Sequence, residues 1–165
     1  GRIQLDLGPV SLAEIIPAAV RSYAFLIESR PIRLILPEAL DDLPPVRADK
    51  GRLSHVLSAL LHNAIVYSPP SSVISVETSI EDDDNDLRSI HITLHDEGCG
   101  VSPEDKGHLF ERYFRSQNPL VRDIPGIGLS LYLARAFLEM QSGKIWYETR
   151  PAGGSSFHIR LPLSD

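Results

Sequence analysis

Residues 49–70, DKGRLSHVLSALLHNAIVYSPP, contain the clearest helical pattern of the chain. Asp49 belongs to the residue types that cap helix N-termini, and the prolines at 69 and 70 end the pattern because proline cannot continue a helix. Between these ends, apolar residues recur at the spacing that places them on one helix face. The stripe comprises Leu53, Val56, Leu57, Leu60, Leu61, Ala64 and Ile65. We therefore predict an amphipathic helix that packs against a flat partner.

The residues that follow this helix predict a β-hairpin. Apolar and polar side chains alternate over 73–80 and again over 90–95, which is typical of half-buried strands. An acidic run separates the two strands, and we interpret it as a solvated connection; the alternative, a calcium site, lacks a glycine-containing twelve-residue loop closed by Glu. The run consists of Glu81, Asp82, Asp83, Asp84 and Asp86.

The N-terminal part predicts a strand and a helix. Alternation over residues 3–7 favours a short strand, and Ser11 with Glu14 has the spacing of a capping box. The helix that follows is expected to reach about Ser29, with Pro17 kinking its first turns or delaying its start. Further short strands are predicted at 32–36 and 46–48.

The C-terminal part predicts two more helices and a second hairpin. Ser102 and Pro103 have the N-cap and first-turn positions of a short helix. Residues 115–125 are predicted to be an irregular loop, and 128–141 an amphipathic helix with Gly143 as its C′ residue. A closing hairpin is predicted from strands at 145–149 and 157–161.

The composition indicates one globular domain. The chain has 165 residues, 42% of them hydrophobic, and a net charge of −6 to which the acidic run contributes five negatives. It shows no apolar run of membrane-spanning length, no signal-peptide pattern and no basic cluster that would favour nucleic acid. The single cysteine, Cys99, excludes an internal disulfide and a cysteine zinc site. The predicted fold class is α+β, a two-layer α/β sandwich whose mixed, mostly antiparallel sheet is covered on one face by helices.

Two glycine-containing turns are candidate ligand sites. Residues 96–100, DEGCG, and 126–129, GIGL, lie where the backbone approaches another group or adopts a positive φ. The second turn opens a helix, whose free N–H groups and positive dipole end favour phosphate. Taken alone, each turn favours a structural role over a ligand site, because short glycine patterns recur by chance.

Four stretches in chain order resemble the N, G1, F and G2 boxes of the catalytic domain of sensor histidine kinases. They are 60–69 (LLHNAIVYSP), 96–100 (DEGCG), 109–115 (LFERYFR) and 126–131 (GIGLSL). The flanks 46–56 and 143–163 are similar as well, so the resemblance covers nearly the whole chain. It implies the Bergerat ATP-binding fold of the GHKL ATPase superfamily, which is shared with type II topoisomerases, Hsp90-type chaperones and mismatch-repair ATPases.

The resemblance also implies a set of nucleotide-binding residues. Asn63 matches the residue that ligates Mg²⁺, and an amide oxygen is a hard ligand that suits this ion. Asp96 matches the acceptor of the adenine amine, and Tyr67 a position that often stacks an aromatic ring on the base. Arg115 matches a basic position that reaches the phosphates. The complete expected set is Asn63, Tyr67, Asp96, Gly98, Gly100, Arg115, Gly126, Gly128 and Leu129, with ATP and Mg²⁺ as cofactors.

Two positions depart from the family pattern. Val66 stands where a Lys or Arg is common, and the loss of such a charged contact weakens binding by about 1.5–3 kcal/mol. Ser130 replaces a frequent glycine. These departures favour an alternative in which the fold serves as a non-catalytic, pseudokinase-like nucleotide sensor or scaffold. A serine-kinase anti-sigma factor of the same superfamily is a third reading.

The resemblance implies a protein-histidine kinase domain of a two-component system, occupying residues 1–165. No catalytic residue is assigned, because none of the six histidines lies in an H-E-x-x-x-P-like phosphoacceptor context. The acceptor histidine is expected on a separate dimerisation domain, with a response regulator as an indirect partner. We expect a cytoplasmic domain that is monomeric when isolated and contacts neither nucleic acid nor membrane, whether or not the full-length protein is membrane-attached. Docking is expected through Phe110, Tyr113 and Phe114.

Overall fold

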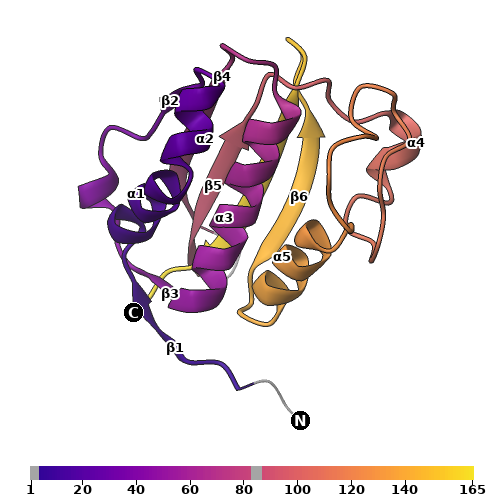
Figure 1. The fold of residues 1–165 in the computed structure, drawn as a ribbon. Coiled ribbons are helices and arrows are strands. Elements are labelled where there is room, and N and C mark those ends of the chain that lie inside the picture. The colour runs from indigo at the N-terminus through magenta and orange to yellow at the C-terminus, as the bar shows by residue number, and fades with distance from the viewer. Residues whose placement is uncertain (1–3, 83–86) are drawn as a thin grey trace.

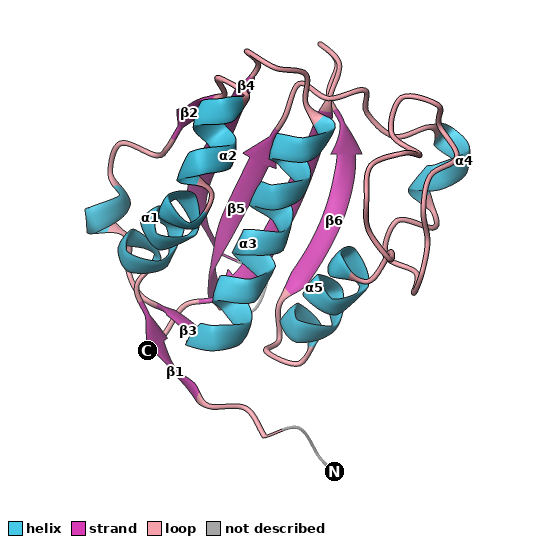
Figure 2. Ribbon diagram, in the orientation of Figure 1, coloured by secondary structure: helices cyan, strands magenta, loops and turns pink. Residues whose placement is uncertain are grey.

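The computed structural model describes residues 4–82 and 87–165 and shows a two-layer α/β sandwich (Figure 1). The main sheet has the order β2-β4-β5-β7-β6, in which β2 pairs parallel to β4 and all other neighbours are antiparallel. The helices form one layer in front of this sheet (Figure 2). The predicted fold class is therefore confirmed. The strands are β2 (Arg33–Ile35), β4 (Val73–Asp82), β5 (Arg88–His95), β6 (Lys144–Thr149) and β7 (Ser155–Pro162).

The helix α3 (Lys50–Tyr67) lies at the centre of the helical layer, between α1 (Leu12–Ser22) and α5 (Ser130–Glu139). Asp49 caps it as predicted, since its Oδ1 accepts a hydrogen bond of 3.0 Å from the Arg52 N–H. All seven residues of the predicted stripe are buried. Burial of an aliphatic side chain contributes about 1.5–3 kcal/mol, so this stripe fixes α3 on the sheet.

The predicted hairpin is formed by β4 and β5. Val76 is opposite Leu94 and Thr78 is opposite Ile92, and this register sends Ile90, Ile92 and Leu94 into the core. Asp83, Asp84 and Asp86 of the acidic run lie outside the described residues. The second predicted hairpin is formed by β6 and β7.

The N-terminal predictions need correction. Strand β1 (Leu7–Val10) begins at the residue where the predicted strand was expected to end, and it pairs with β3 (Val46–Asp49); Ile3 lies outside the described residues. The Ser11 side chain makes no cap hydrogen bond, and the Glu14 carboxylate pairs with Lys50, so the predicted capping box does not form. The helix runs through Pro17 and stops at Tyr23, after which α2 (Ala24–Ser29) begins. Packing of the buried stripe of α1 outweighs the hydrogen bond that proline removes.

The end of α5 also differs from the prediction. The left-handed residue is Ser142, with φ 61°, and its N–H bonds to the Glu139 carbonyl while that of Gly143 bonds to Leu138. This pattern is a Schellman motif in which Ser142, and not Gly143, is the C′ residue. Glycine is needed at 143 for another reason: a Cβ there would lie 2.8 Å from the Leu161 side chain and 3.0 Å from the Arg160 carbonyl oxygen.

Two short helical segments lie in the connections between the main elements. A 3₁₀ turn, η1 (Leu40–Asp42), precedes β3, and α4 (Pro103–Lys106) is capped by the Ser102 hydroxyl as predicted. Of the helices in residues 4–82 and 87–165, none combines the length and the hydropathy that a membrane span requires.

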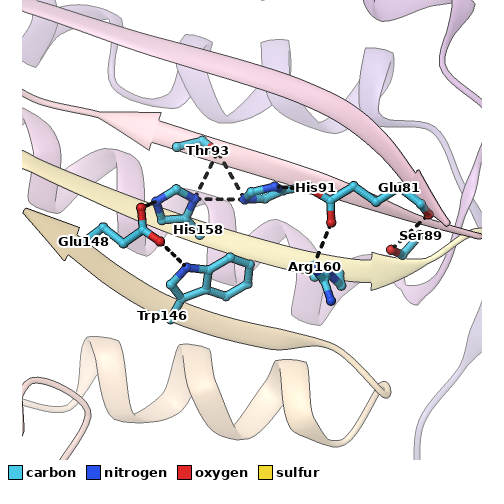
Figure 3. A network of polar contacts seen from close by, with 8 residues as sticks. All are labelled: Glu81, Ser89, His91, Thr93, Trp146, Glu148, His158 and Arg160. Carbon is cyan, nitrogen blue, oxygen red and sulfur yellow. Dashed lines mark hydrogen bonds and ion pairs between the residues drawn. The ribbon is translucent and has the colours of Figure 1, made fainter. Parts of the chain in front are cut away.

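The face of the sheet opposite the helices carries a network of histidines and carboxylates (Figure 3). His91 Nε2 lies 2.8 Å from His158 Nδ1, and the Thr93 hydroxyl is within 3.3 Å of both nitrogens. The other nitrogen of each ring faces a carboxylate: His91 Nδ1 is 2.8 Å from Glu81, and His158 Nε2 is 3.2 Å from Glu148. Burial lowers the pKa of His158, against the opposing effect of Glu148, and the nearby His91 and His95 lower it further.

Stability is expected to decline in mild acid because of His158. The folded state favours the neutral ring, whereas the unfolded chain takes up a proton near pH 6.5, so this part of the stability is complete above that pH and is lost as the pH falls toward the lowered pKa. Urea unfolding between pH 5 and 8 measures the slope. His158→Gln should flatten it, while His55→Gln, at an exposed position, should leave it unchanged. An unaltered slope in His158→Gln would contradict this assignment.

Candidate functional site

A cavity of about 230 Å³ lies between α3, the loop after β5 and the segment that leads into α5. It gathers residues from all four sequence boxes, which are widely separated along the chain. Of the nine predicted nucleotide-binding residues, Leu129 does not line the cavity and is instead the N-cap residue of α5. The eight that line it are Asn63, Tyr67, Asp96, Gly98, Gly100, Arg115, Gly126 and Gly128.

Helix α3 supplies one wall of the cavity. Asn63 and Tyr67 are four residues apart and so lie on the same helix face. Asn63 is half-buried, and Tyr67 is 38% exposed. His62 and Val66 line the cavity as well. Val66 was named from the sequence as a departure from the family pattern, but His62 was not assigned to the site. Val66 makes this wall apolar where the resembling kinases commonly carry a cation.

Asp96 supplies a buried carboxyl group to the cavity. Asp96 is only 4% exposed. Its Oδ1 accepts hydrogen bonds from the N–H groups of Gly98 at 2.8 Å and Ser155 at 3.2 Å. No described residue donates to Oδ2, which leaves this oxygen free to accept a bond from a ligand. Burial raises the pKa of the carboxyl, while the two N–H donors and the charge of Arg150 oppose that rise.

Two glycines are required by close backbone approaches around the cavity. A Cβ at Gly98 would lie 2.8 Å from the Tyr67 carbonyl oxygen, so the glycine lets the loop reach the end of α3. Gly128 has a φ of +73°, and a Cβ there would lie 2.5 Å from the Phe114 carbonyl oxygen. Its own carbonyl accepts a 2.8 Å hydrogen bond from the Tyr113 N–H. Both turns therefore have a structural reason for glycine beside their expected role at a ligand.

Arg115 holds the loop that was predicted to be irregular. Its Nη2 donates to the carbonyl oxygens of Arg122, at 3.0 Å, and of Ile124. Val121 and Ile124 of the same loop line the cavity, so the loop closes one side of it. The contact of Arg115 with phosphate stays a prediction, because in this structure the guanidinium bonds to the loop.

The three aromatic residues predicted to dock a partner have different environments. Tyr113 is 65% exposed, and Phe110 packs against Phe157 with a centroid separation of 6.4 Å. Phe114 lines the cavity and stacks on His108. Only Tyr113 of the three therefore offers an exposed ring.

Comparison with solved structures shows the same fold. The catalytic domain of the histidine kinase ThkA superposes with a TM-score of 0.79 at 23% identity, covering 98% of this chain and all of that one. The full-length ShkA structure in complex with AMPPNP has a TM-score of 0.78 at 19% identity, and the match covers 99% of this chain and 33% of that one.

Curated relatives are sensor proteins of greater length. The adaptive-response sensory kinase SasA of a Synechocystis species is 31% identical over 98% of this chain and 40% of its own length. The methyl sulfide methyltransferase-associated sensor of Methanosarcina acetivorans is 25% identical over 98% of this chain, which spans 16% of that protein. The family model described as histidine kinase-, DNA gyrase B-, and HSP90-like ATPase matches residues 48–165. That match includes most of the chain and the whole cavity, and the protein therefore belongs to this ATPase family.

Proposed function

We propose that this chain is the ATP-binding catalytic domain of a sensor histidine kinase, which transfers the γ-phosphoryl group of ATP to a histidine on a separate dimerisation domain. The observation that carries the proposal is Asp96: a buried carboxylate that lines a cavity together with several glycines, with Oδ1 bonded to backbone N–H groups and Oδ2 without a donor among the described residues. A buried acceptor of this kind matches a ligand that presents a hydrogen-bond donor, such as the adenine amine.

The base and the phosphates would occupy different parts of the cavity. Asp96 Oδ2 would accept a hydrogen bond from the amine, with Tyr67 positioned to cover the base and Gly98 leaving room for it. The phosphates would lie toward Gly126 and Gly128, which precede α5. The first N–H groups of α5, from Ser130 onward, have no partners within the helix and favour negative charge.

Asn63 fits a role as the protein ligand of Mg²⁺. It is the residue on the α3 wall with a side-chain oxygen of the kind that Mg²⁺ prefers, and Mg²⁺ commonly takes few protein ligands and completes its shell with phosphates and water. When bound, the ion would neutralise charge on the phosphates. The residues of this chain orient the nucleotide and exclude water, and phosphoryl transfer itself depends largely on such positioning.

The acceptor histidine is expected on another domain. His62 of α3 lines the cavity, but its ring packs on that of Tyr23, the residue between α1 and α2, with a centroid separation of 5.6 Å. Exposed Tyr113 lies beside the cavity and would contact the incoming domain. We also propose a cytoplasmic domain that is monomeric alone, with a response regulator acting downstream of the dimerisation domain.

Calorimetry and phosphotransfer test the proposal together. The isolated domain should bind Mg-ADP with a Kd in the micromolar to millimolar range, and it should label a supplied cognate dimerisation domain from labelled ATP. Val66→Lys adds a cation at the cavity wall and should tighten binding by about tenfold or more, as expected for a charge-assisted hydrogen bond. Absence of labelled phosphohistidine with both the wild type and Val66→Lys would contradict kinase activity.

The apolar Val66 wall supports a second candidate, a non-catalytic nucleotide sensor or scaffold. For this candidate we expect Mg-ADP binding without phosphotransfer, or no binding at millimolar ADP. Val66→Lys distinguishes the kinase from the sensor or scaffold. If the variant transfers phosphate while the wild type does not, the natural chain is the sensor.

A further inference from the structure

Arg150 reaches from the turn between β6 and β7 to the loop that carries Asp96. Its Nη1 donates a 2.7 Å hydrogen bond to the backbone carbonyl oxygen of Asp96, and the side chain is half-buried. The two residues are 54 positions apart in the sequence. Arg150 does not line the cavity, so any effect on a ligand passes through Asp96.

The same turn contacts Asp96 at several further points. The Asp96 N–H donates to the Ser155 carbonyl at 2.9 Å, and the Ser155 N–H returns a bond to Asp96 Oδ1. Gly154 lies so close that a Cβ would be 2.0 Å from the Asp96 carbonyl oxygen, which is the atom that Arg150 also binds. The β6–β7 turn therefore fixes both the backbone and the carboxyl group of Asp96.

Of the two basic side chains that act on the Asp96 carboxylate, Arg150 is the one that always carries a positive charge. His95 at the end of β5 also acts favourably on the carboxylate, but an imidazole is charged only when protonated. A guanidinium stays protonated throughout the accessible pH range. Burial raises the pKa of the nearby Cys99 thiol, and the charge of Asp96 acts in the same direction. The other titratable side chains from the surrounding elements are Tyr67 of α3, Tyr147 of β6 and Glu97, whose carboxylate accepts a bond from the Val73 N–H of β4.

We propose that Arg150 is a positioning residue of the nucleotide site, which holds the Asp96 backbone in place and supplies the positive charge that keeps the buried carboxylate ionised. This inference rests on the proposed function of Asp96 as the acceptor of a base amine. An ionised carboxylate only accepts hydrogen bonds, whereas a protonated one carries an O–H donor that opposes the donor of the ligand. Loss of Arg150 would make nucleotide binding fail at a higher pH.

Titration of Asp96 tests the charge without any nucleotide. The carboxyl ¹³C signal of Asp96, assigned with Asp96→Asn, is followed from pH 3 to 9 in the wild type, Arg150→Met and Arg150→Lys. We expect the midpoint of Arg150→Met to lie above that of the wild type and that of Arg150→Lys to stay near it, because lysine retains the charge. Arg47→Met removes one charge from an exposed position of β3, which pairs with β1 in a separate two-stranded sheet, and should leave the midpoint unchanged.

Calorimetry with Mg-ADP over the same pH range tests the consequence. Below the midpoint of Arg150→Met, its Kd should rise relative to wild type by about tenfold per pH unit until the wild type also titrates. A coincident Asp96 midpoint in Arg150→Met and wild type would overturn the inference, and so would a loss of affinity that is equal at every pH. If the wild type binds no nucleotide while the midpoints differ, the proposed function fails and the assignment of Arg150 to Asp96 stands.

Discussion

Asp96→Asn is expected to weaken Mg-ADP binding by about 3 kcal/mol, or roughly a hundredfold in Kd. The asparagine oxygen can replace Oδ1 and keep the bonds from Gly98 and Ser155. The amide NH₂ then takes the place of Oδ2 and presents donors to the donor of the base. Calorimetry at pH 8 measures the effect.

The same variant should unfold no more easily than the wild type at neutral pH. Burial raises the pKa of Asp96, so the ionised form is the less favourable one in the folded state. The corresponding stability is present below the unfolded pKa and is lost as the pH rises through the raised folded pKa. A neutral asparagine removes this loss. Glu97→Gln is the matched control, since it neutralises the adjacent exposed carboxylate but keeps an acceptor for the Val73 N–H. Equal affinity of Asp96→Asn and Glu97→Gln would argue against an amine acceptor at Asp96.

Gly154→Ala is expected to be the most destabilising single change at the site. Gly154 and its neighbour Gly153 both have φ +91°, but a Cβ at Gly153 meets nothing within 4 Å. Alanine at 153 should therefore cost about 1–2 kcal/mol for the strained backbone alone. At 154 the new methyl group would also lie 2.0 Å from the Asp96 carbonyl oxygen and 3.0 Å from the Glu97 Cα, and both are backbone atoms.

The turn and the loop after β5 must separate to admit that methyl group. Overpacking of this kind costs a further 1–3 kcal/mol or so. It also displaces Asp96, whose backbone carbonyl is bound by Arg150 and whose carboxylate is bound by the Ser155 N–H. Urea unfolding of both glycine variants isolates the steric part as their difference. Mg-ADP binding should be retained in Gly153→Ala and lost in Gly154→Ala. Similar unfolding free energies for the two variants would show that the close approach tolerates a side chain.

The elements that were predicted correctly are those whose local pattern repeats over many residues. The stripe of α3 and the alternation of β4 and β5 each provide several apolar positions at one period, and burial of that face is the dominant favourable term. The errors concern the ends of elements. The first strand lies at Leu7–Val10 and not at 3–7, and the first helix stops at Tyr23 instead of continuing to about Ser29. Ser142 rather than Gly143 is the C′ residue of α5, because neighbouring elements decide these positions.

The same distinction between local patterns and tertiary contacts applies to the candidate site. The resemblance of the four boxes to those of sensor histidine kinases was enough to predict eight residues that line the cavity, because each box is a short local segment that can be recognised in the sequence. The contacts of Arg115 with the loop carbonyls and of Arg150 with Asp96 were not predictable in this way, nor was the pairing of His91 with His158 across 67 positions. The Arg115 contacts form within one irregular loop, which has no repeating pattern. The strand order β5-β7-β6 brings the other two pairs together, since side chains distant in sequence meet where separate strands become neighbours, and no local pattern encodes that distance.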